Sequence, residues 1–432
     1  MTRLFVFLRR ENLHYWFFGF LFINFFLGQL PSPNPNARWA TLVSLAEEET
    51  FQIDALRMFT LDWAHAPNGH YYSNKAPGPV LLALPLFLVL DRVATWDAPS
   101  LPEARKKRLQ FREGILWVLS FLIQAIPFAI VAGFALMWLE RQGVKKKNLH
   151  WIALALLFGN TAALFMNSFF GHGMAATFFL ASVIFLLEEK YWTAGFLIGG
   201  ALLCDYSSAL FLLPLAVFLP RAKPAFLGVF LAALFLGWYH FHCFGSPWAL
   251  PAQFQNPQFV EAGRSFDLPS PMIALSLLFG PRRGLLFTQP WVFILFPFAF
   301  RSPRVLSGYV LGSFLLLLLM NSSFGNWHGG NVAGPRYLST VLPALVLFAP
   351  FLDGHAWKFF KVGVAISVLF FIVVFATQLY APPEPTLLVF YLSQMSENPV
   401  SRTAIRFAIV AVGLTGGTVA LLRSSDPLGE PA

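Results

Sequence analysis

The sequence predicts an all-α, polytopic membrane protein with a single domain over residues 1–432. Hydrophobic residues make up 57% of the chain and charged residues only 12%, which is less charge than the surface of a soluble protein of this size needs. Apolar runs of roughly 18 residues or more recur from end to end, as expected for helices that cross a bilayer. Many of the 13 tryptophans lie at the ends of these runs, where an interfacial aromatic belt is expected.

The charge of the chain indicates membrane topology and not a nucleic-acid partner. The net charge is +9, but lysines and arginines lie in short clusters between apolar runs, as in the loops of membrane proteins. The sequence has no P-loop, no G-x-G-x-x-G fingerprint and no His/Cys cluster with metal-ligand spacing. No cofactor is therefore predicted, and a need for a divalent metal stays open. The two cysteines, Cys204 and Cys243, are too few for a disulfide framework, and whether they form one bridge also stays open.

The first apolar run, residues 15–30, is predicted to be an uncleaved transmembrane helix. Arg3, Arg9 and Arg10 precede it, and basic residues at this place favour a cytoplasmic N-terminus. No small-residue cleavage site follows the run, and Pro31 comes instead.

A large first outer loop is predicted over residues 31–113. Near its start, Trp39, Leu42, Val43 and Ala46 follow the i, i+3, i+4, i+7 spacing of one helix face. We therefore expect a short amphipathic helix that lies in the membrane interface.

Residues 77–90 decide the orientation of every later helix. The stretch is apolar, but at about 14 residues it is short for a membrane span, and it has prolines at 77, 79 and 85. The positive-inside rule holds mainly for short loops. If residues 77–90 do not cross the membrane, five short basic segments all fall on the same side of it, which the rule identifies as the cytoplasmic side. These segments are 141–147, Lys190, 221–223, 301–304 and 358–361. We therefore predict a juxtamembrane or re-entrant helix here, which leaves the basic group 105–108 in the long outer loop.

About twelve transmembrane helices are then expected. Besides residues 15–30, the predicted spans are 114–139, 150–167, 174–188, 193–204, 206–220, 225–241, 286–300, 305–321, 339–352, 360–380 and 403–422. The second large outer loop is 244–285, and smaller outer loops are 169–173, 321–337 and 381–402. On this topology the polar loops gather at the outer face of the membrane.

Two aspartates in the polar segment 53–79 are the candidate catalytic residues. A transferase that moves a sugar onto a hydroxyl needs a carboxylate to accept the proton, and Asp54 and Asp62 can supply it. Asp54 also suits the N-cap of a short helix, and Asp62 stands beside Trp63, whose ring could stack on a sugar. We expect Asp54 to be the base and Asp62 to contact donor or acceptor, with the reverse assignment left open.

Cationic and hydroxyl groups near these aspartates fit a lipid-linked phosphate. Lys75 lies among turn residues, where its ammonium can meet a phosphate as a point charge, or a headgroup if the segment is an ordinary interfacial loop. Tyr71 and Tyr72 can add hydroxyl donors. Arg336 lies in a later glycine-rich turn and can form a two-pronged contact with phosphate. We expect Lys75 and Arg336 to hold the donor's phosphate together.

Further polar residues are candidates for the same outer-face site: His70, His172, Asp205, Arg282, Arg283 and His328. Ionisable residues within a membrane protein's apolar segments are functional candidates by default, although a polar group at a helix end can also simply face water. The arginine pair can equally be charge that flanks a membrane helix. The histidines are weaker candidates for a base than the carboxylates; for His70, the nearby charge of Lys75 disfavours its protonation.

The order and spacing of several short motifs resemble a known family. They are similar to those of the polytopic GT-C glycosyltransferases, which use polyprenyl-phosphate-linked sugars, and within these to the bacterial branch related to protein O-mannosyltransferases and lipid A aminoarabinose transferases. The motifs are Arg38-Trp-Ala, Lys75-Ala-Pro-Gly, Phe244-Gly-Ser-Pro, Arg283-Gly-Leu-Leu with Pro290, and Gly334-Pro-Arg-Tyr-Leu. The resemblance covers most of the chain and implies a GT-C-like bundle with juxtamembrane helices in a large first periplasmic loop.

One departure from the family concerns the catalytic carboxylate. The family usually has an acidic residue just before the first arginine motif, and here these positions hold Pro35 and Asn36. The resemblance associates Lys75 with the lipid phosphate, but it provides no catalytic residue. Asp54 or Asp62 must then take that role, or the chain is not catalytic in the usual way.

These features together predict a glycosyltransferase of the bacterial cytoplasmic membrane with its site facing the periplasm. Its partners would be a polyprenyl-phosphate sugar donor, membrane lipids, and a glycan, lipid or protein acceptor. The alternatives are a transporter or flippase of a lipid-linked precursor and a non-catalytic membrane assembly factor. A transporter should show two related halves and ionisable groups near mid-membrane, whereas the polar groups here lie mostly in outer loops and no halves are visible.

Overall fold

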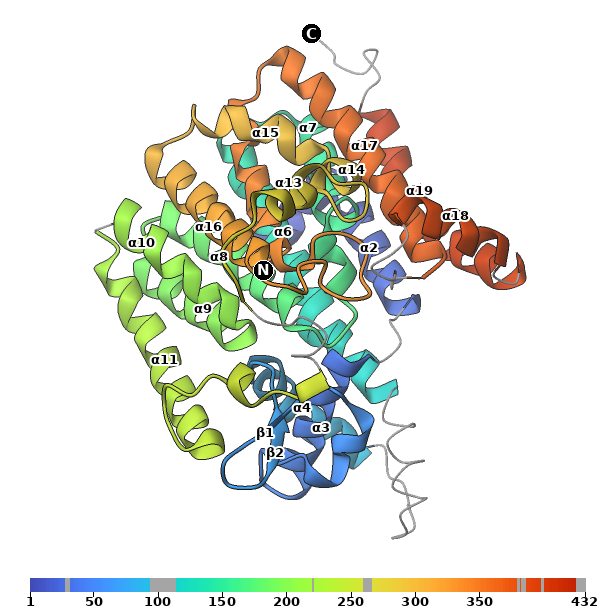
Figure 1. Ribbon diagram of the computed structural model, residues 1–432. Helices are drawn as coiled ribbons and strands as arrows, with labels where there is room; N and C mark the ends of the chain where they lie inside the picture. Colours follow the sequence, from blue (N-terminus) through green and yellow to red (C-terminus); the bar gives the residue numbers. More distant parts are fainter. Residues whose placement is uncertain are drawn as a thin grey trace.

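The structure of the protein is a computed structural model that describes residues 1–27, 32–93, 114–219, 221–258, 266–378, 381, 386–397 and 400–424. The end of the predicted first span (28–30), the basic group 105–108 and several residues of the last outer loop lie outside this part of the chain. The described chain is mostly helical, with one two-stranded antiparallel ribbon. Figure 1 shows a large helical body and, below it, a smaller unit that contains α3, α4, β1 and β2.

Five helices in the described chain are long and apolar enough to cross a membrane. They are Gly114–Arg141, α11 (Lys223–Phe244), α16 (Arg304–Ser322), α17 (Gly354–Ala376) and Arg402–Arg423, which belongs to α19 (Val400–Arg423). Shorter apolar helices pack beside them. The prediction of a helical membrane protein is confirmed at this level, whereas the number of about twelve spans stays a prediction.

The other helical elements complete the body. Its α-helices are α1 (Thr2–Arg10), α2 (His14–Phe26), α6 (Ile126–Arg141), α7 (Lys146–Phe158), α8 (Gly171–Leu187), α9 (Tyr191–Cys204), α10 (Leu212–Phe218), α13 (Pro271–Phe279), α14 (Leu285–Thr288), α15 (Trp291–Ala299) and α18 (Leu387–Glu397). Its 3-10 helices are η3 (Thr161–Phe165), η4 (Tyr206–Phe211), η5 (Pro251–Phe254), η6 (Arg336–Leu338) and η7 (Leu342–Phe351). A π-helical turn, η2 (Phe121–Ala125), precedes α6 just before Pro127, whose ring cannot continue the regular hydrogen-bond ladder.

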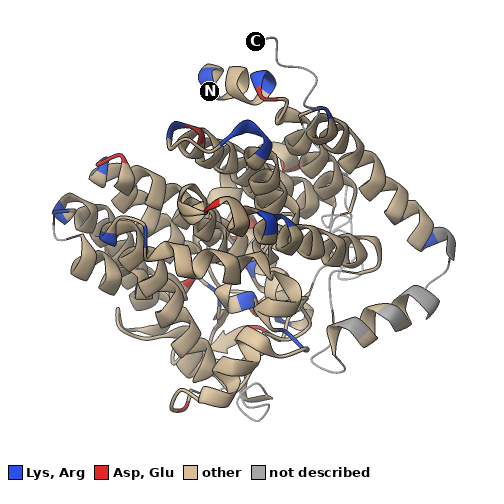
Figure 2. Cartoon of the chain, turned by 90° about the horizontal axis from the view of Figure 1, so that it is seen from above, with Lys and Arg blue, Asp and Glu red and all other residues tan. Residues whose placement is uncertain are grey.

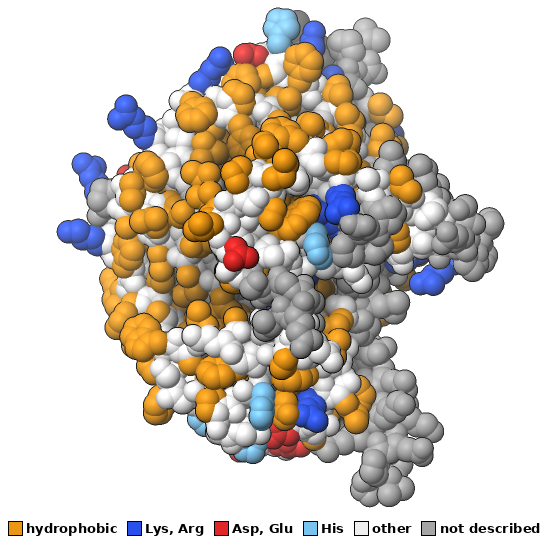
Figure 3. Space-filling view, viewed as in Figure 1, with side chains coloured by type: hydrophobic (Ala, Val, Ile, Leu, Met, Phe, Trp, Pro, Cys, Tyr) orange, Lys and Arg blue, Asp and Glu red, His pale blue; other side chains and the backbone are white. Residues whose placement is uncertain are grey.

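The surface of the helical body is apolar, and its charges lie mostly at helix ends and in loops. Seen from above, long stretches of helix carry no charged residue (Figure 2). In Figure 3, hydrophobic side chains spread across the body while lysines and arginines project at its upper left edge. Phe196, Phe230 and Leu369 are each more than half exposed. An apolar surface of this extent is typical of a membrane-contacting protein.

The smaller unit is formed by α3 (Pro33–Glu47), η1 (Asp54–Phe59), β1 (Trp63–His65), β2 (Tyr71–Ser73) and α4 (Gly78–Val93). Pro33 lies in the first turn of α3, where its missing N–H costs no helix hydrogen bond. The ribbon reverses through Gly69, whose φ of 85° suits a residue without a Cβ. Its register places Ala64 opposite Tyr72.

A helix, α3, is present where the sequence predicts an amphipathic helix in the membrane interface, but it is buried on nearly every side, at polar Arg38 and Thr41 as well, and its apolar face contacts protein. Trp39, Leu42 and Val43 are buried, and the rings of Trp39 and Phe87 of α4 meet edge-on at 5.5 Å. The next helix, α4, has 16 residues and is short for a membrane span. The opposite face of α4 exposes apolar side chains: Leu82, Leu86, Leu88 and Val89.

The second large outer loop lies against the ribbon. The backbone N–H of Asn256 donates to the carbonyl of Trp63 at 3.1 Å, and its side-chain amide donates to the carbonyl of Leu61 at 3.2 Å. Gln255 forms an isolated bridge with Ala64. The loop after α11 and the first outer loop therefore lie on the same side of the body, as the predicted topology requires (Figure 1).

Candidate functional site

The two tyrosines of β2 lie in different surroundings, because successive side chains of a strand point to opposite faces. Tyr71 stacks on His65 with ring centroids 4.5 Å apart, and the guanidinium of Arg57 lies 4.3 Å from its centroid. Tyr72 is buried, where it contacts Phe244 edge-on and its hydroxyl accepts a hydrogen bond from Asn68 at 3.0 Å. The structure therefore does not bring both hydroxyls to one position.

Asp54 and His70 form an exposed pair on the outer side of the ribbon. The ring Nδ1 of His70 lies 2.6 Å from Oδ2 of Asp54, and both side chains are 43% exposed. Oδ1 of Asp54 accepts the backbone N–H of Tyr71 at 2.6 Å. Asp54 thus ties the start of η1 to β2 and lies in contact with solvent.

Asp62 and Lys75 form a buried pair on the inner side of the ribbon. Nζ of Lys75 lies 3.1 Å from Oδ1 of Asp62, whose side chain is 5% exposed. The backbone N–H of Asp62 donates to the hydroxyl of Thr60, and the N–H of Asn74 donates to the carbonyl of Asp62. Of the two predicted catalytic aspartates, Asp62 is therefore the one that the structure places beside Lys75.

Arg38 of α3 is a buried cation that sequence reasoning did not select as a site residue. One guanidinium nitrogen donates to the side chain of Asn34, and Nε has no hydrogen-bond partner among the described residues. Burial lowers the pKa of Arg38 to about 10, while the charges of Asp205 and Asp62 oppose this shift. Arg38 therefore keeps its charge at neutral pH, and it lies between the two carboxylates.

Asp205 and His172 form a second buried pair where three elements meet. Nδ1 of His172 in the first turn of α8 lies 2.5 Å from Oδ2 of Asp205, which follows α9. Oδ1 of Asp205 accepts the backbone N–H of Ser207 at 3.1 Å and its hydroxyl at 2.8 Å. Burial alone would raise the pKa of Asp205, but His172 and Ser207 outweigh it and hold that pKa well below its usual range.

Gly171 makes the approach of α8 to α9 possible. A Cβ at this position would lie 2.0 Å from the carbonyl oxygen of Cys204 and 2.9 Å from a guanidinium nitrogen of Arg38. Only a residue without a side chain fits there. The glycine therefore brings His172, Asp205 and Arg38 to one place.

Arg336 approaches the same place from η6. Its guanidinium lies 4.8 Å from the ring centroid of Tyr337 and 5.7 Å from that of Phe170, and it donates to the Tyr337 hydroxyl at 2.9 Å. The ring of His172 meets that of Tyr337 edge-on at 5.7 Å, and the charge of Arg336 acts on His172.

The remaining predicted residues lie in the loops beside Arg336. Arg283 is buried and donates to the carbonyls of Gly330 at 3.3 Å and Ala381 at 2.9 Å, and burial lowers its pKa to about 10. Nδ1 of His328 accepts the backbone N–H of Gly330 at 3.1 Å. Arg282 is exposed. Arg283 and His328 thus shape the glycine-rich turn.

We call six of these residues the inner cluster: Arg38, Asp62, Lys75, His172, Asp205 and Arg336. Three cations, two carboxylates and one imidazole come together from the smaller unit and from the ends of helices in the body. Such a set can bind an anion and can also accept a proton. Among the described residues, no group of three or more His, Cys, Asp or Glu side chains is placed to hold a metal ion.

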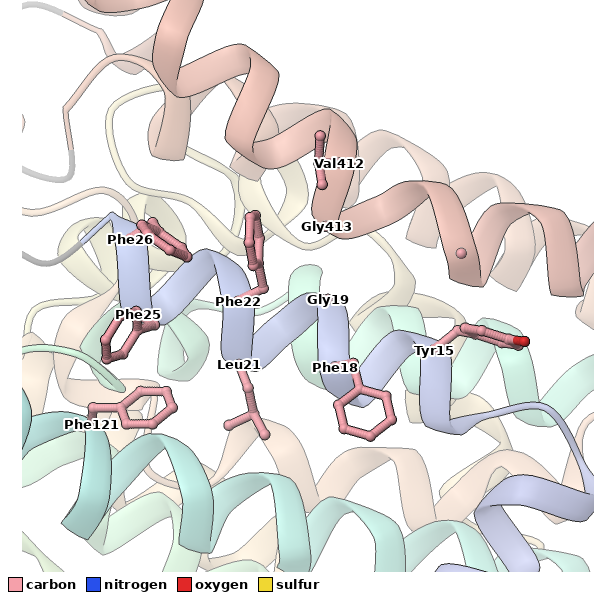
Figure 4. A pocket seen from close by; sticks show the side chains of 11 residues that line it. Tyr15, Phe18, Gly19, Leu21, Phe22, Phe25, Phe26, Phe121, Val412 and Gly413 are labelled. Atoms are coloured by element: carbon pink, nitrogen blue, oxygen red, sulfur yellow. The ribbon is translucent and has the colours of Figure 1, made fainter.

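An apolar groove lies along α2, beside α19 (Figure 4). Phe22 points toward Val412 and Gly413 of α19, whereas Phe25 points toward Phe121, and the cavity volume is about 510 Å³. It is large enough for part of a hydrocarbon chain.

Asn167 fixes the C-terminal end of α2 beside the segment that leads to the inner cluster. Its side-chain amide donates to the carbonyl of Leu27 at 2.9 Å and lies 3.4 Å from that of Asn24. Asn167 begins the short segment that leads to Gly171 and His172, so the end of α2 lies beside this segment.

The free thiols Cys204 and Cys243 are both buried, and they form no bridge.

The chain matches no protein-family model, no curated protein and no solved structure.

Proposed function

We propose that the chain is a membrane glycosyltransferase that moves a sugar from a polyprenyl-phosphate donor to a glycan, lipid or protein acceptor. The observation that carries this proposal is the inner cluster, in which cations, carboxylates and an imidazole lie together beside the ends of the apolar helices α8 and α9. A lipid phosphate needs cations beside an apolar surface, and a transferred sugar needs a group that takes the acceptor's proton.

The donor's phosphate would contact Arg38, Lys75 and Arg336. Arg38 and Arg336 each carry an Nε that has no hydrogen-bond partner among the described residues, so each has donor capacity left for an anion. Arginine presents several N–H groups in one plane, which suits phosphate oxygens. The prenyl chain would lie in the apolar groove along α2, the helix whose C-terminal end Asn167 holds beside the segment before His172.

The reaction then needs one base and no acid. The acceptor hydroxyl loses its proton as its oxygen attacks the anomeric carbon, and the polyprenyl phosphate leaves as a stable anion at neutral pH. The cations of the inner cluster would stabilise the charge that grows on this leaving group. We place the protein in the bacterial cytoplasmic membrane with this site on the periplasmic face, on the short-loop charge argument.

A transfer assay tests the proposal. The purified chain in lipid nanodiscs is incubated with undecaprenyl-phosphate-linked, radiolabelled hexoses and pentoses and with acceptor membranes from cells that lack the chain. We expect release of undecaprenyl phosphate together with label in the acceptor fraction for at least one donor. Arg336→Ala should reduce this release, whereas Arg301→Ala is the matched control. Arg301 also lies over an aromatic ring, that of Phe298 at 4.6 Å, but it is 61% exposed and pairs with Asp353.

The two other functions give different results in the same system. A transporter or flippase would move the intact donor across a liposome membrane without release of undecaprenyl phosphate. A non-catalytic assembly factor would do neither. Either result would reject the proposed enzyme.

A further inference from the structure

We infer that His172, oriented by Asp205, is the general base that takes the proton of the acceptor hydroxyl. The inference rests on the proposed function and deepens it. It stands on the buried contact of 2.5 Å between His172 and Asp205, whose negative charge opposes the effect of Arg336 and Arg38 on the ring.

The pair fixes which ring nitrogen can act. Asp205 is a carboxylate at neutral pH and can only accept hydrogen bonds, so Nδ1 of His172, which faces Oδ2, carries the proton. The neutral ring then has its free electron pair on Nε2. Nε2 contacts no hydrogen-bond donor among the described residues, and the side chain keeps 11% exposure. The nitrogen that can accept a proton is therefore the one that remains accessible.

The surroundings hold this geometry in place. Ser207 donates twice to Oδ1 of Asp205, which leaves Oδ2 for the imidazole. The ring of His172 is enclosed by Phe165, Phe170 and Tyr337 at centroid distances of 5.7, 6.3 and 5.7 Å. A side chain held on several sides by packing and by a fixed partner loses little freedom when the reaction begins.

The other carboxylates of the polar segment are less suited to the task. Asp62 is engaged by Lys75 at 3.1 Å, and a carboxylate that is stabilised by a cation is a weaker base. Asp54 is 43% exposed and holds His70 and the backbone of β2. The geometry therefore favours His172 over the two aspartates that the sequence pointed to.

The proton-transfer step is balanced as follows. The acceptor O–H bond breaks and its proton moves to Nε2 of His172, while the oxygen forms a bond to the anomeric carbon. The bond from that carbon to the phosphate oxygen breaks, and polyprenyl phosphate leaves with the electron pair. The imidazolium, stabilised by Asp205, then returns its proton to water. The step needs no oxidant and no reductant.

The experiment compares histidine and aspartate variants in the transfer assay. His172→Ala should lower kcat by about 10²- to 10⁴-fold, the range for loss of a general base, while binding of undecaprenyl phosphate stays within about two-fold. Added imidazole should restore part of the rate if the fold is intact. His65→Gln is the control, because His65 is an exposed histidine on the ribbon outside the inner cluster.

Asp205 positions His172 and does not itself take the proton. This role is tested by measuring kcat of Asp205→Asn as a function of pH. The charges that face His172 are those of Asp205, Arg336 and Arg38. Asp205→Asn removes the only negative one of these three and so lowers the pKa of His172. In the plot of kcat against pH, the fall on the acid side should therefore move to lower pH, and the maximum value of kcat should decrease. A merely structural effect would lower this maximum without moving the fall on the acid side.

The outcomes separate this inference from the proposed function. A wild-type chain that uses none of the donors rejects both. A wild-type chain that transfers sugar, with His172→Ala equally active, overturns the histidine base alone. Loss of turnover in Asp54→Asn with full activity in His172→Ala would return the role to Asp54.

Discussion

Lys75 and Asp62 lie 3.1 Å apart because the ribbon folds them together. Asp62 precedes β1 and Lys75 follows β2, and the register pairs Trp63 with Ser73 between them. The ammonium is 18% exposed and the carboxylate 5%. The pair therefore connects the folding of the ribbon to the position of a cation in the inner cluster.

Lys75→Ala is expected to weaken donor binding by about 10- to 100-fold, because a charge-assisted contact is worth about 1.5–3 kcal/mol. The dissociation constant of undecaprenyl phosphate in nanodiscs measures this effect. Lys190→Ala is the control, since Lys190 also pairs with a carboxylate, Glu188, but is 57% exposed. Equal affinity of the wild type and Lys75→Ala would contradict the role of Lys75 in binding phosphate.

Arg336→Lys is expected to retain part of the affinity that Arg336→Ala loses. Lysine keeps the charge, but it cannot lie flat against Tyr337 and Phe170 or present two parallel N–H groups to phosphate. Titration with undecaprenyl phosphate at two salt concentrations should rank the wild type above Arg336→Lys and that above Arg336→Ala. A lysine variant as weak as the alanine variant would show that the charge of Arg336 is not what matters.

Gly171→Ala is expected to destabilise the fold by about 1–3 kcal/mol, the usual cost of overpacking. Its methyl group would overlap the carbonyl of Cys204, so α8 and α9 must separate and the His172–Asp205 contact must lengthen. Thermal unfolding in nanodiscs measures the loss. Gly354→Ala is the control, because an added Cβ there meets nothing within 4 Å. Equal midpoints for both variants would show that the approach at Gly171 is looser than described.

Cysteine labelling tests the orientation of the two large outer loops. Met58→Cys and Leu268→Cys, at positions that are 81% and 89% exposed, should react with an impermeant maleimide added from the periplasmic side. Lys146→Cys should be protected until the membrane is opened, because it lies in a predicted cytoplasmic loop. The native cysteines are buried and give little background. Labelling of position 146 together with protection of position 58 would invert the predicted topology.

The helical nature of the fold could be predicted because apolar runs and helix periodicity are local. The face of Trp39, Leu42 and Val43 predicted α3 correctly. What this face contacts could not be predicted, because Phe87 reaches it only through the tertiary fold.

The side-chain contacts within the site could not be predicted from the sequence. His172 and Asp205 are 33 positions apart, and nothing in the spacing joins them until α8 and α9 pack. Arg38 is part of the motif Arg38-Trp-Ala but is not among the site residues that the sequence predicts. A lone arginine among the apolar residues of a helix indicates a buried charge. The spacing of the two aspartates also does not predict that Asp54 is held in the exposed pair with His70 and that Asp62 is held beside Lys75.

The close approach at Gly171 also limits how this chain can change over generations. Gly78 at the start of α4 meets the same turn, because a Cβ there would lie 2.5 Å from the carbonyl oxygen of Leu203. The end of α9 is thus enclosed by two glycines from different parts of the chain. Both contacts are made with backbone atoms, which every residue carries. The two glycines are therefore constrained whichever side chains stand at 203 and 204, and substitutions at those two positions do not relieve the constraint.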